Sequence, residues 1–501
     1  MTPSRIHHLL DQNLATRSER PAIRDCDGET YSWGAYAALV QEAETLLRDR
    51  GAAPGERVLV VGENCLSLPV LINACSRIGV WAVPVNARMS SAEIARIKTH
   101  ARPVLTLYTS HISPEAAAHA GSAEALDTGF GRLRFEPGTP DPEPIPDEAD
   151  APAILLYTTG TTGDPKGVML SHANLLFAAQ ASVGLRDLTA EDHVYGGLPL
   201  THVFGVASML MASAQVGAMV ELVTRFDPAR LYSALLDGVT VLPAVPQMHA
   251  LLMAYAEKQG ISRLENAKLR YVSSGAAPLD PAWKRKAEAF YGLPLQNGYG
   301  MTESTAGVSG TRNAIGDPDT SVGPPLPGVE VTLDLALGED PEVGEVLTRG
   351  AHVMTGYFRN PEATAQAITD GWLRTGDLGR FDDQGRLHIV GRSKELIIRG
   401  GFNVYPPEVE AALNDHPAVV QCAVIGRPAH GDEEILAFVQ PTAPGATDAA
   451  TLRSFVAERL AGYKRPSRIF VVETLPAAAT GKILKHQLLT RFAALLDSSE
   501  A

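Results

Sequence analysis

The chain has 501 residues, of which 45% are hydrophobic and 20% are charged, so it is long enough to form two or more globular domains. Its formal net charge of −14 excludes the basic face of a nucleic-acid-binding protein, while leaving room for a local basic pocket that binds a small anion. The four cysteines are scattered without a CxxC pair, which favours reduced thiols in a cytoplasmic protein over disulfides or a zinc site.

The first part of the sequence alternates strand-like runs with helical segments. Strand-like runs at 57–61, 80–85 and 104–108 are separated by helical stretches, and Ser90 and Glu93 have the spacing of a capping box. A similar rhythm returns between residues 227 and 291. This alternation predicts an α/β fold with largely parallel sheets.

One segment, residues 203–220, carries no charge and reaches the length at which a membrane span is considered. It contains two glycines, two serines and a glutamine, and it is bordered by His202 and Glu221. This composition predicts a helix buried in a large core, and therefore no integral membrane segment. The polar N-terminus likewise lacks the apolar core of a secretory signal.

The composition of the sequence changes at three further places. Residues 136–152 are acidic and rich in proline, which predicts an exposed connector between two sub-domains. From about residue 321, short strands punctuated by glycine predict a smaller β-rich unit. After the sequence GRSK at 391–394, a compact α+β segment is expected.

Residues 157–167 read YTTGTTGDPKG and follow an apolar run. Hydroxyls, glycine N–H groups and one lysine together suit a polyanion such as a nucleoside triphosphate. The segment is not a P-loop, because Pro165 precedes Lys166 and Gly167 follows it. A surface loop without a ligand is the alternative at this stage.

Five further stretches carry residues suited to chemistry: PLTHVFG at 199–205, YGMTE at 299–303, WLRTGD at 372–377, GRSKE at 391–395 and TGK at 480–482. Each has an ordinary structural interpretation, since an aspartate after glycine is commonly a turn residue and a surface lysine is commonly just solvated. Their order along the chain is the stronger signal.

In that order, and over nearly its whole length, the chain resembles the adenylate-forming superfamily of acyl- and aryl-CoA synthetases, peptide-synthetase adenylation domains and luciferases. The resemblance implies a large N-terminal AMP-binding domain, residues 1–393, made of two α/β sub-domains and a β-rich sub-domain. It also implies a small mobile α+β C-terminal domain, residues 394–501, with its hinge at Lys394.

The chemistry of this family explains why these residue types are needed. A carboxylate is a poor electrophile, so AMP is first transferred to it from ATP with release of pyrophosphate, and a thiol then displaces AMP. Negative charge builds around the α-phosphorus in the first step, so Mg²⁺, a lysine and backbone donors are required there.

The resemblance assigns the ATP site residue by residue. Glu303 would bind Mg²⁺ together with Thr158, Thr302 would lie beside the α-phosphate, and Asp377 would accept hydrogen bonds from the ribose with support from Arg392. The β- and γ-phosphates would be held by Thr158, Thr159, Gly160, Thr161, Thr162 and Lys166. The adenine would be lined by Ala276, Asn297, Gly298 and Tyr299.

The remaining assignments concern the two half-reactions. Lys482 would stabilise the adenylation transition state, and rotation of the C-terminal domain at Lys394 would then replace it with Gly400 and Gly401 at the pantetheine arm of CoA. Arg225 would lie near the CoA nucleotide. The acid itself would meet His202, Phe204, Ser208, Gly298 and Met301, with His202 counted among the catalytic residues.

Two glycines in the pocket restrict the acid. Gly205 stands where amino-acid-activating relatives place an aspartate, and Gly298 stands where malonate-type enzymes use an arginine. The other lining residues are apolar: Phe204, Val206, Met209, Leu210, Val245, Met248 and Met301. A medium- or long-chain fatty acid is therefore favoured, with an apolar aromatic acid such as a benzoate or cinnamate as the alternative.

The expected activity is that of an ATP-dependent acid–CoA ligase whose substrates are a small carboxylate, ATP and CoA. Transfer of the acyl group to a separate carrier protein and oxidation of the adenylate, as luciferases do, are the alternatives. A scaffold that has lost catalysis is disfavoured, because Lys482, Glu303 and Asp377 are all retained. A homodimer is compatible with the sequence.

Overall fold

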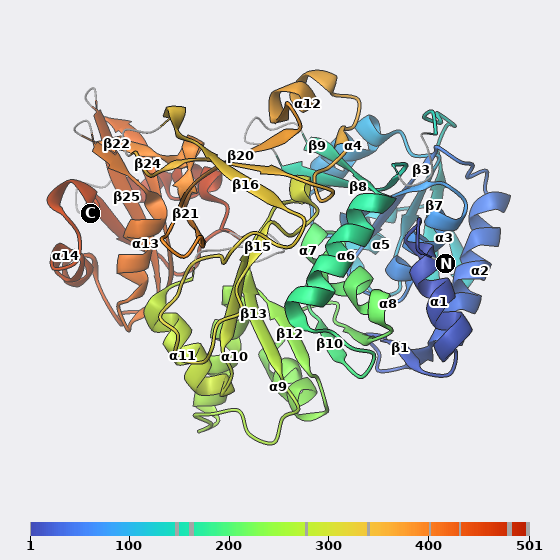
Figure 1. The fold of residues 1–501 in the computed structure, drawn as a ribbon, viewed down its shortest axis with the longest axis horizontal. Helices are drawn as coiled ribbons and strands as arrows, with labels where there is room; N and C mark the ends of the chain where they lie inside the picture. The colour runs from blue at the N-terminus through green and yellow to red at the C-terminus, as the bar shows by residue number, and fades with distance from the viewer. Residues whose placement is uncertain are drawn as a thin grey trace.

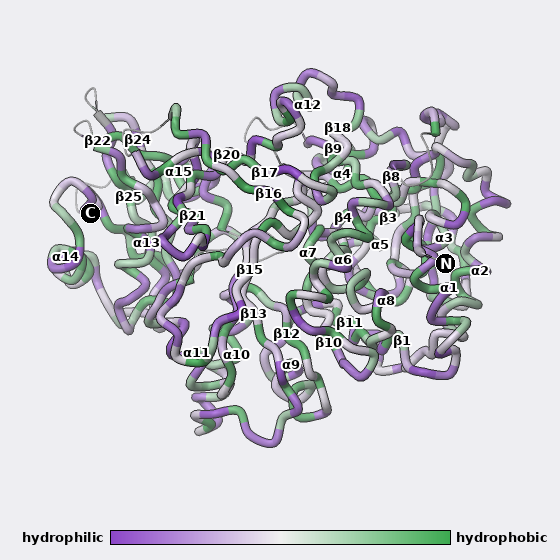
Figure 2. Tube along the Cα trace, viewed as in Figure 1, coloured by the Kyte–Doolittle hydropathy of each residue, from purple (hydrophilic) through white to green (hydrophobic). Residues whose placement is uncertain are grey.

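The protein is described here by a computed structural model, which covers residues 2–145, 150–159, 165–275, 279–337, 341–399, 402–429, 432–477 and 483–496. Three β-sheets make up the larger part of the molecule, and a separate lobe holds the C-terminal residues at the end opposite the N-terminus (Figure 1). Figure 2 shows hydrophobic residues along the central strands and hydrophilic residues on the outermost loops.

The first sheet is parallel at its centre and antiparallel at both edges. Its order is β18-β9-β8-β4-β3-β5-β7-β6. The strands are β3 (Arg57–Gly62), β4 (Trp81–Asn86), β5 (Leu105–Tyr108), β6 (Glu124–Thr128), β7 (Gly131–Pro137), β8 (Pro152–Thr159), β9 (Pro165–Ser171) and β18 (Gly356–Tyr357). The helices that precede or connect them are α1 (His7–Arg17), α2 (Trp33–Asp49), α3 (Ser67–Arg77), α4 (Ser91–Ala101) and α5 (Pro114–Ala120). Helix α4 begins with the capping box predicted at Ser90 and Glu93.

The second sheet has the order β15-β14-β13-β12-β10-β11-β1-β2. Its strands are β1 (Pro21–Arg24), β2 (Thr30–Ser32), β10 (His193–Gly196), β11 (Met219–Leu222), β12 (Val241–Ala244), β13 (Tyr271–Gly275), β14 (Leu295–Tyr299) and β15 (Ser309–Gly310). Its helices are α6 (His172–Arg186), α9 (Pro228–Leu236), α10 (Pro246–Lys258) and α11 (Pro281–Tyr291). The pairs β10–β11, β10–β12, β12–β13 and β13–β14 are parallel, as the alternation predicted.

The predicted connector, residues 136–152, joins β7 to β8, which are strands of the same sheet. Part of the connector is fixed to the rest of the molecule. Arg359 forms ion pairs with Asp141 and Glu143 at 2.6 Å each, and the buried Arg57 donates a hydrogen bond to the Asp141 carbonyl oxygen. The segment therefore does not divide the two large sheets. A single apolar core runs through both of them.

The smaller units are rich in β structure. The third sheet contains β16 (Glu330–Asp334), β17 (Gly344–Arg349), β19 (Ile368–Thr369), β20 (Trp372–Phe381) and β21 (Leu387–Arg392), with α12 (Pro361–Ala367) beside it. The C-terminal lobe contains β22 (Ile397–Arg399), β23 (Phe402–Val404), α13 (Pro406–Asn414), β24 (Val419–Ala429), β25 (Asp432–Pro441), α14 (Ala449–Ala457), β26 (Arg468–Val471), α15 (Leu488–Arg491) and α16 (Ala493–Leu496). Apolar clusters of its own hold this lobe together.

The segment predicted as one buried helix over 203–220 is buried but is not one helix. It consists of α7 (Val203–Gly205), a π-helix (Val206–Met211) and α8 (Ala212–Val216), and Gly217 then adopts φ 82° before β11 begins. The prediction was wrong in its last residues because a left-handed glycine ends the helix there. In the described part of the chain, no helix is both long and apolar enough to cross a bilayer.

Candidate active site

Glycines at the carboxyl ends of β13 and β14 form the floor of the candidate site. Gly275 pairs with Gly298 in the parallel register of the two strands. A Cβ atom at Gly275 would lie 3.0 Å from Cε1 of Phe204, and one at Gly298 would lie 3.1 Å from the Ser309 carbonyl oxygen. The ends of parallel strands commonly hold ligands in α/β folds, and the absent side chains keep this edge open.

The YTTGTTGDPKG segment includes the ends of two antiparallel paired strands, β8 and β9. Thr158 and Lys166 face each other across the two strands, while Gly160, Thr161 and Thr162 lie outside the described residues. The Nζ atom of Lys166 lies 4.8 Å from the centroid of the Tyr357 ring, within the range of a cation–π contact. The lysine is therefore held at the start of β9.

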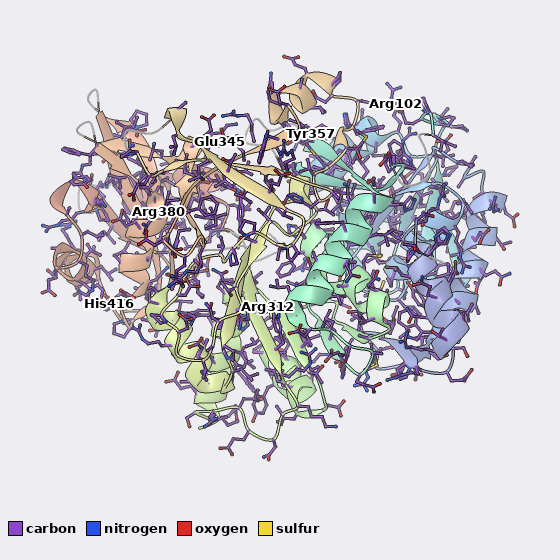
Figure 3. The ribbon with its side chains drawn as sticks, in the orientation of Figure 1. Arg102, Arg312, Glu345, Tyr357, Arg380 and His416 are labelled. Atoms are coloured by element: carbon purple, nitrogen blue, oxygen red, sulfur yellow. The ribbon has the colours of Figure 1, made fainter. Side chains whose placement is uncertain are left out.

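Tyr357, which is labelled in Figure 3, contacts both Lys166 of β9 and Glu303, the predicted magnesium ligand. Its hydroxyl donates a hydrogen bond to Oε1 of Glu303 at 2.9 Å, and both residues are buried. Burial and the neighbouring carboxylate raise the pKa of Tyr357, so the phenol stays a donor at neutral pH. Tyr357 is not predicted by any motif, because nothing in the Gly356-Tyr357 dipeptide indicates which carboxylate the fold places beside it.

A second carboxylate is held in the same manner. Asp377 in β20 accepts a hydrogen bond from the Tyr299 hydroxyl at 2.5 Å on Oδ2 and one from Nε of Arg392 at 2.9 Å on Oδ1. Burial and the charge of Asp377 raise the pKa of Tyr299 well above its ordinary value. A carboxylate has about four acceptor positions, so Asp377 can still accept ribose hydroxyls while it is fixed by these two neighbours.

The structure describes most, but not all, of the residues predicted to bind adenine and magnesium. The Asn297 side chain is buried and donates to the Ser321 carbonyl oxygen at 3.0 Å, whereas Ala276 lies outside the described residues. Thr302 and Glu303 form a buried 3₁₀ turn after β14. Across the described residues, no group of three or more His, Cys, Asp or Glu side chains could hold a metal ion. One carboxylate fits Mg²⁺ at a nucleotide site, because the phosphates and water supply its other ligands.

Two family models match the chain. The model of the AMP-binding enzyme matches residues 10–358, and that of the AMP-binding enzyme C-terminal domain matches residues 408–482. The chain belongs to the AMP-binding enzyme family. The resemblance to adenylate-forming enzymes and the fold class expected from it are both confirmed.

Relatives of the AMP-binding family match over almost the full length of the chain. The chain is 34% identical to 4-coumarate–CoA ligase 5 of Oryza sativa subsp. japonica, over 98% of this chain and 95% of the relative. It is 33% identical to feruloyl-CoA synthase of Amycolatopsis sp, over 91% and 94%. A solved o-succinylbenzoate coenzyme A synthetase from Bacillus subtilis, in complex with ATP and a magnesium ion, superposes with a TM-score of 0.81 at 28% identity, covering 96% and 98%.

The predicted acid-binding residues of this AMP-binding enzyme lie on and around the π-helix. His202 starts α7, where its Nδ1 accepts from the Phe204 N–H at 3.3 Å, and Ser208 lies buried inside the π-helix. Phe204 and Met301 are half-buried, whereas the other apolar lining residues named from the sequence are buried. A π-helix widens the backbone locally and is frequent at functional sites.

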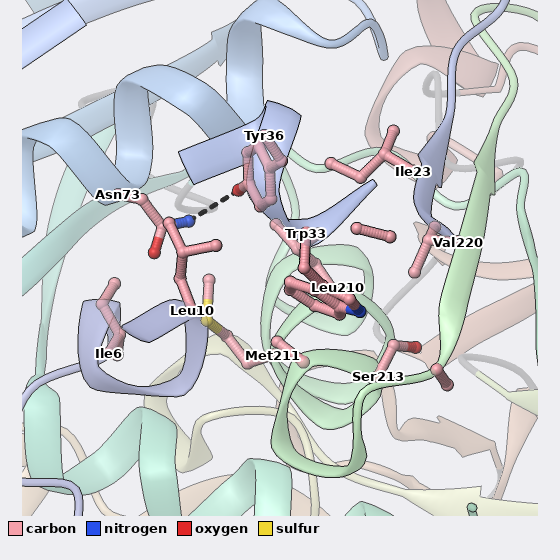
Figure 4. Close-up of a pocket in the computed structure, with 13 residues that line it drawn as sticks. Ile6, Leu10, Ile23, Trp33, Tyr36, Asn73, Leu210, Met211, Ser213 and Val220 are labelled. Carbon is pink, nitrogen blue, oxygen red and sulfur yellow. Dashed lines mark hydrogen bonds between the residues drawn. The ribbon is translucent and has the colours of Figure 1, made fainter. Parts of the chain in front are cut away.

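A small cavity lies beside this helix (Figure 4). Its volume is about 10 Å³, enough for one water, and its wall includes Trp33, Ser213 and the hydrogen-bonded pair Asn73 and Tyr36. The Trp33 Nε1 and Ser213 Oγ atoms have no hydrogen-bond partner within the described part of the chain.

The structure describes only some of the residues that are predicted to act in the thioester step. Arg225 donates to the Glu63 carboxylate at 2.9 and 3.1 Å and also pairs with Glu115, so a CoA phosphate would have to share it. Lys394 is exposed in a 3₁₀ turn (Ser393–Glu395) that follows β21. Gly400, Gly401 and Lys482 lie outside the described residues. Their roles in this AMP-binding enzyme stay predictions.

Proposed function

We propose that this AMP-binding enzyme is an ATP-dependent carboxylic acid–CoA ligase that activates an acid with an apolar body, either a medium- or long-chain fatty acid or an aromatic acid. The relatives reported above are CoA synthetases and ligases by name, and they align with almost the whole chain. The structural observation that supports the activity most is the placement of Lys166 and Glu303 against one buried tyrosine, Tyr357.

The first half-reaction transfers AMP to the acid. A carboxylate oxygen of the acid attacks the α-phosphorus of ATP, the bond from that phosphorus to the bridging oxygen breaks, and pyrophosphate leaves. Lys166 would hold the departing phosphates, while Tyr357 keeps Glu303 oriented toward them. Mg²⁺ bound through Glu303 would neutralise charge on the phosphates. Asp377 would fix the ribose.

In the second half-reaction the thiolate of CoA attacks the carbonyl carbon of the acyl adenylate, and AMP leaves as the new thioester forms. The hinge at Lys394 would turn the C-terminal domain between the two steps. Lys482 would act in adenylation alone, and Gly400 with Gly401 would leave room for the pantetheine arm. The homodimer and the cytoplasmic location stay predictions.

The geometry around Gly205 adds a steric reason against an amino-acid substrate. A Cβ atom at Gly205 would lie 2.1 Å from the Pro199 carbonyl oxygen, so no side chain fits there without a backbone shift. An aspartate that pairs with an α-ammonium therefore has no place in this helix. Gly298, with no side chain to offer a second carboxylate, supports an acid with a single carboxylate at this end of the pocket.

Pyrophosphate release from ATP and Mg²⁺ tests this function. The panel of acids should run from acetate to palmitate and include malonate, benzoate, coumarate and several amino acids, each with and without CoA. We expect sustained release for an apolar acid only when CoA is present. Release that is indifferent to CoA for every acid would favour a carrier protein as acceptor, and preference for malonate or an amino acid would overturn the reading of Gly298 or Gly205.

Separate half-reactions test the role of Lys482. The variant Lys482→Ala should lose adenylation by several orders of magnitude, because the lysine would stabilise charge in that transition state. Attack of CoA on a chemically prepared acyl adenylate should be spared. Equal loss in both half-reactions would contradict the assigned role.

A further inference from the structure

Three arginines lie close together where α6 ends, and only two of them have a carboxylate partner. Arg270 pairs with Asp192 through Nε at 2.8 Å and Nη2 at 2.5 Å, and Arg312 pairs with the exposed Asp187 at 3.3 Å. The third is Arg186, the last residue of α6, which has no carboxylate among its partners in the described part of the chain. The carboxylates of Asp192 and Asp187 are thus already paired with other arginines.

Arg186 is buried, with 5% of its surface exposed. One Nη1 hydrogen goes to the carbonyl oxygen of Ser208, while Nε has no hydrogen-bond partner within the described residues. Arginine keeps its charge in proteins, so this is a desolvated cation with a spare donor. Such groups are costly unless an anion or a strong acceptor meets them.

The neighbours of Arg186 place it against the predicted acid pocket. Its guanidinium carbon lies 5.9 Å from the centroid of the Phe204 ring, and the ring itself lies on Gly275 at the end of β13. Ser208, whose carbonyl accepts from Arg186, is a predicted pocket residue in the π-helix. Arg186 therefore lies beside Phe204 in α7 and Ser208 in the π-helix, two of the predicted pocket residues.

One face of β13 extends this polar environment. Successive side chains of a strand alternate, so Tyr271, Ser273 and Gly275 point to the same face, with about 13 Å between the first and last Cα atoms. Tyr271 interacts with the Arg186 guanidinium and with the side chain of Ser273. The face runs from the open floor at Gly275 to a cationic, donor-rich end.

We propose that Arg186 is a specificity-determining residue at the far end of the acid pocket, and that it selects acids whose distal end carries a hydrogen-bond-accepting oxygen. This inference rests on the proposed ligase function and narrows its substrate. A saturated tail would leave Nε of Arg186 without an acceptor in a dry environment, whereas a methoxy, hydroxy or carbonyl oxygen would satisfy it. An aromatic acid with a para oxygen substituent fits this face better than an unsubstituted fatty acid.

Two acids of nearly equal size separate this proposal from a general preference for apolar acids. The unmodified enzyme should be assayed for CoA-dependent pyrophosphate release with 3-(4-methoxyphenyl)propenoate and 3-(4-ethylphenyl)propenoate, which differ in an acceptor oxygen. We expect kcat/KM to favour the methoxy acid by roughly ten-fold or more, the size of a buried donor left unpaired. A ratio near one, or a preference for the ethyl acid, would overturn the proposal.

The variant Arg186→Met should bring the methoxy-to-ethyl ratio close to one, mainly through faster turnover of the ethyl acid. The substitution removes a desolvated cation but also the donor to the Ser208 carbonyl, so thermal unfolding measures the stability of the variant. If Arg186→Met does not fold, Arg186→Lys keeps the charge but loses the planar donor set, and it should reduce the ratio. Arg312→Met is the matched control, because this arginine is exposed and paired with Asp187, and it should keep the ratio unchanged.

A purely structural role for Arg186, limited to its hydrogen bond with the Ser208 carbonyl, would lower stability and both rates together without moving the ratio. That outcome would refute the proposal. Failure of the proposed ligase function is distinguishable, because then no acid of the wider panel would give CoA-dependent release. If other acids are turned over and the two propenoates are not discriminated, only the role of Arg186 fails.

Discussion

At the scale of single residues, Tyr357 contacts two groups, Lys166 and Glu303, that are predicted to serve the ATP chemistry. Its hydroxyl bonds to Glu303 and its ring lies under Lys166. In Tyr357→Phe the hydroxyl alone is lost, so Glu303 loses an orienting partner. The Mg²⁺ concentration for half-maximal adenylation should rise roughly ten-fold, the usual cost of removing such a support, with little change in KM for ATP at saturating Mg²⁺.

The variant Tyr357→Leu provides the comparison for this prediction. It removes the aromatic face as well as the hydroxyl, so Lys166 also loses its cation–π contact. KM for ATP should then rise together with the Mg²⁺ requirement. If Tyr357→Phe and Tyr357→Leu leave the Mg²⁺ dependence unchanged, the hydrogen bond to Glu303 has no role in catalysis.

Sequence motifs identified several candidate site residues but not their supports. Lys166, Glu303 and Asp377 follow from the order of motifs along the chain, and their ligand contacts stay predictions. Tyr357 lies 54 residues beyond Glu303, and Arg186 lies 22 residues before Ser208. Contacts at such separations depend on the folded register of strands and helices, which no local pattern encodes.

At the scale of elements, Gly205 determines whether the α7 and π-helix segment can pack. Its missing side chain allows the Pro199 carbonyl oxygen to approach to 2.1 Å from the position a Cβ atom would take. Gly205→Ala should therefore displace the segment, destabilise the protein by roughly 3 kcal/mol and abolish turnover of the preferred acid. Chemical denaturation measures the first effect.

Gly184 in α6 is the matched control for this prediction. A Cβ atom there would meet nothing within 4 Å, and the residue is exposed. Gly184→Ala should stabilise the protein by about 0.5–1 kcal/mol, because alanine loses less backbone entropy in a helix. Similar losses for both variants would show that the close approach at Gly205 is unimportant.

At the scale of the whole molecule, two carboxyl groups meet between the larger part of the molecule and the C-terminal lobe. Asp280 caps α11 by accepting from the Trp283 N–H at 2.7 Å, and Asp415 at the end of α13 lies beside it. Burial, reinforced by Asp415, raises the pKa of Asp280 to about 6. The folded protein thus holds this proton more tightly than the unfolded chain, whose aspartates titrate near about 4.

The sign of the pH dependence follows from this shift. The stability contributed by protonated Asp280 is fully present below about pH 4 and is lost as the pH rises through its folded-state pKa of about 6. Asp280→Asn keeps a good helix cap but cannot ionise. The unfolding midpoint of the variant should rise relative to that of the unmodified protein as the pH increases from 4 to 7. Parallel plots of midpoint against pH for the two proteins would contradict this.

The sequence indicated the layers of the molecule better than their connections. Hydrophobic runs and the Ser90 capping box correspond to β3, β4, β5 and α4 within one or two residues. The acidic, proline-rich composition of residues 136–152 indicated an exposed segment. It did not indicate that the strands before and after the segment, β7 and β8, belong to the same sheet. Sheet order is set by long-range pairing, and composition carries no information about it.

Because β7 and β8 belong to one sheet, the chain tolerates a break between them in principle. Pieces ending at Ile145 and beginning at Asp150 would still share the pairing of β8 with β4 and the ion pairs of Arg359 with Asp141 and Glu143. Co-expressed halves should therefore find each other and restore ligase activity, which neither half has alone. Residues 146–149 would then be a site at which the enzyme can be split. Its activity would report that two proteins fused to the halves lie close together.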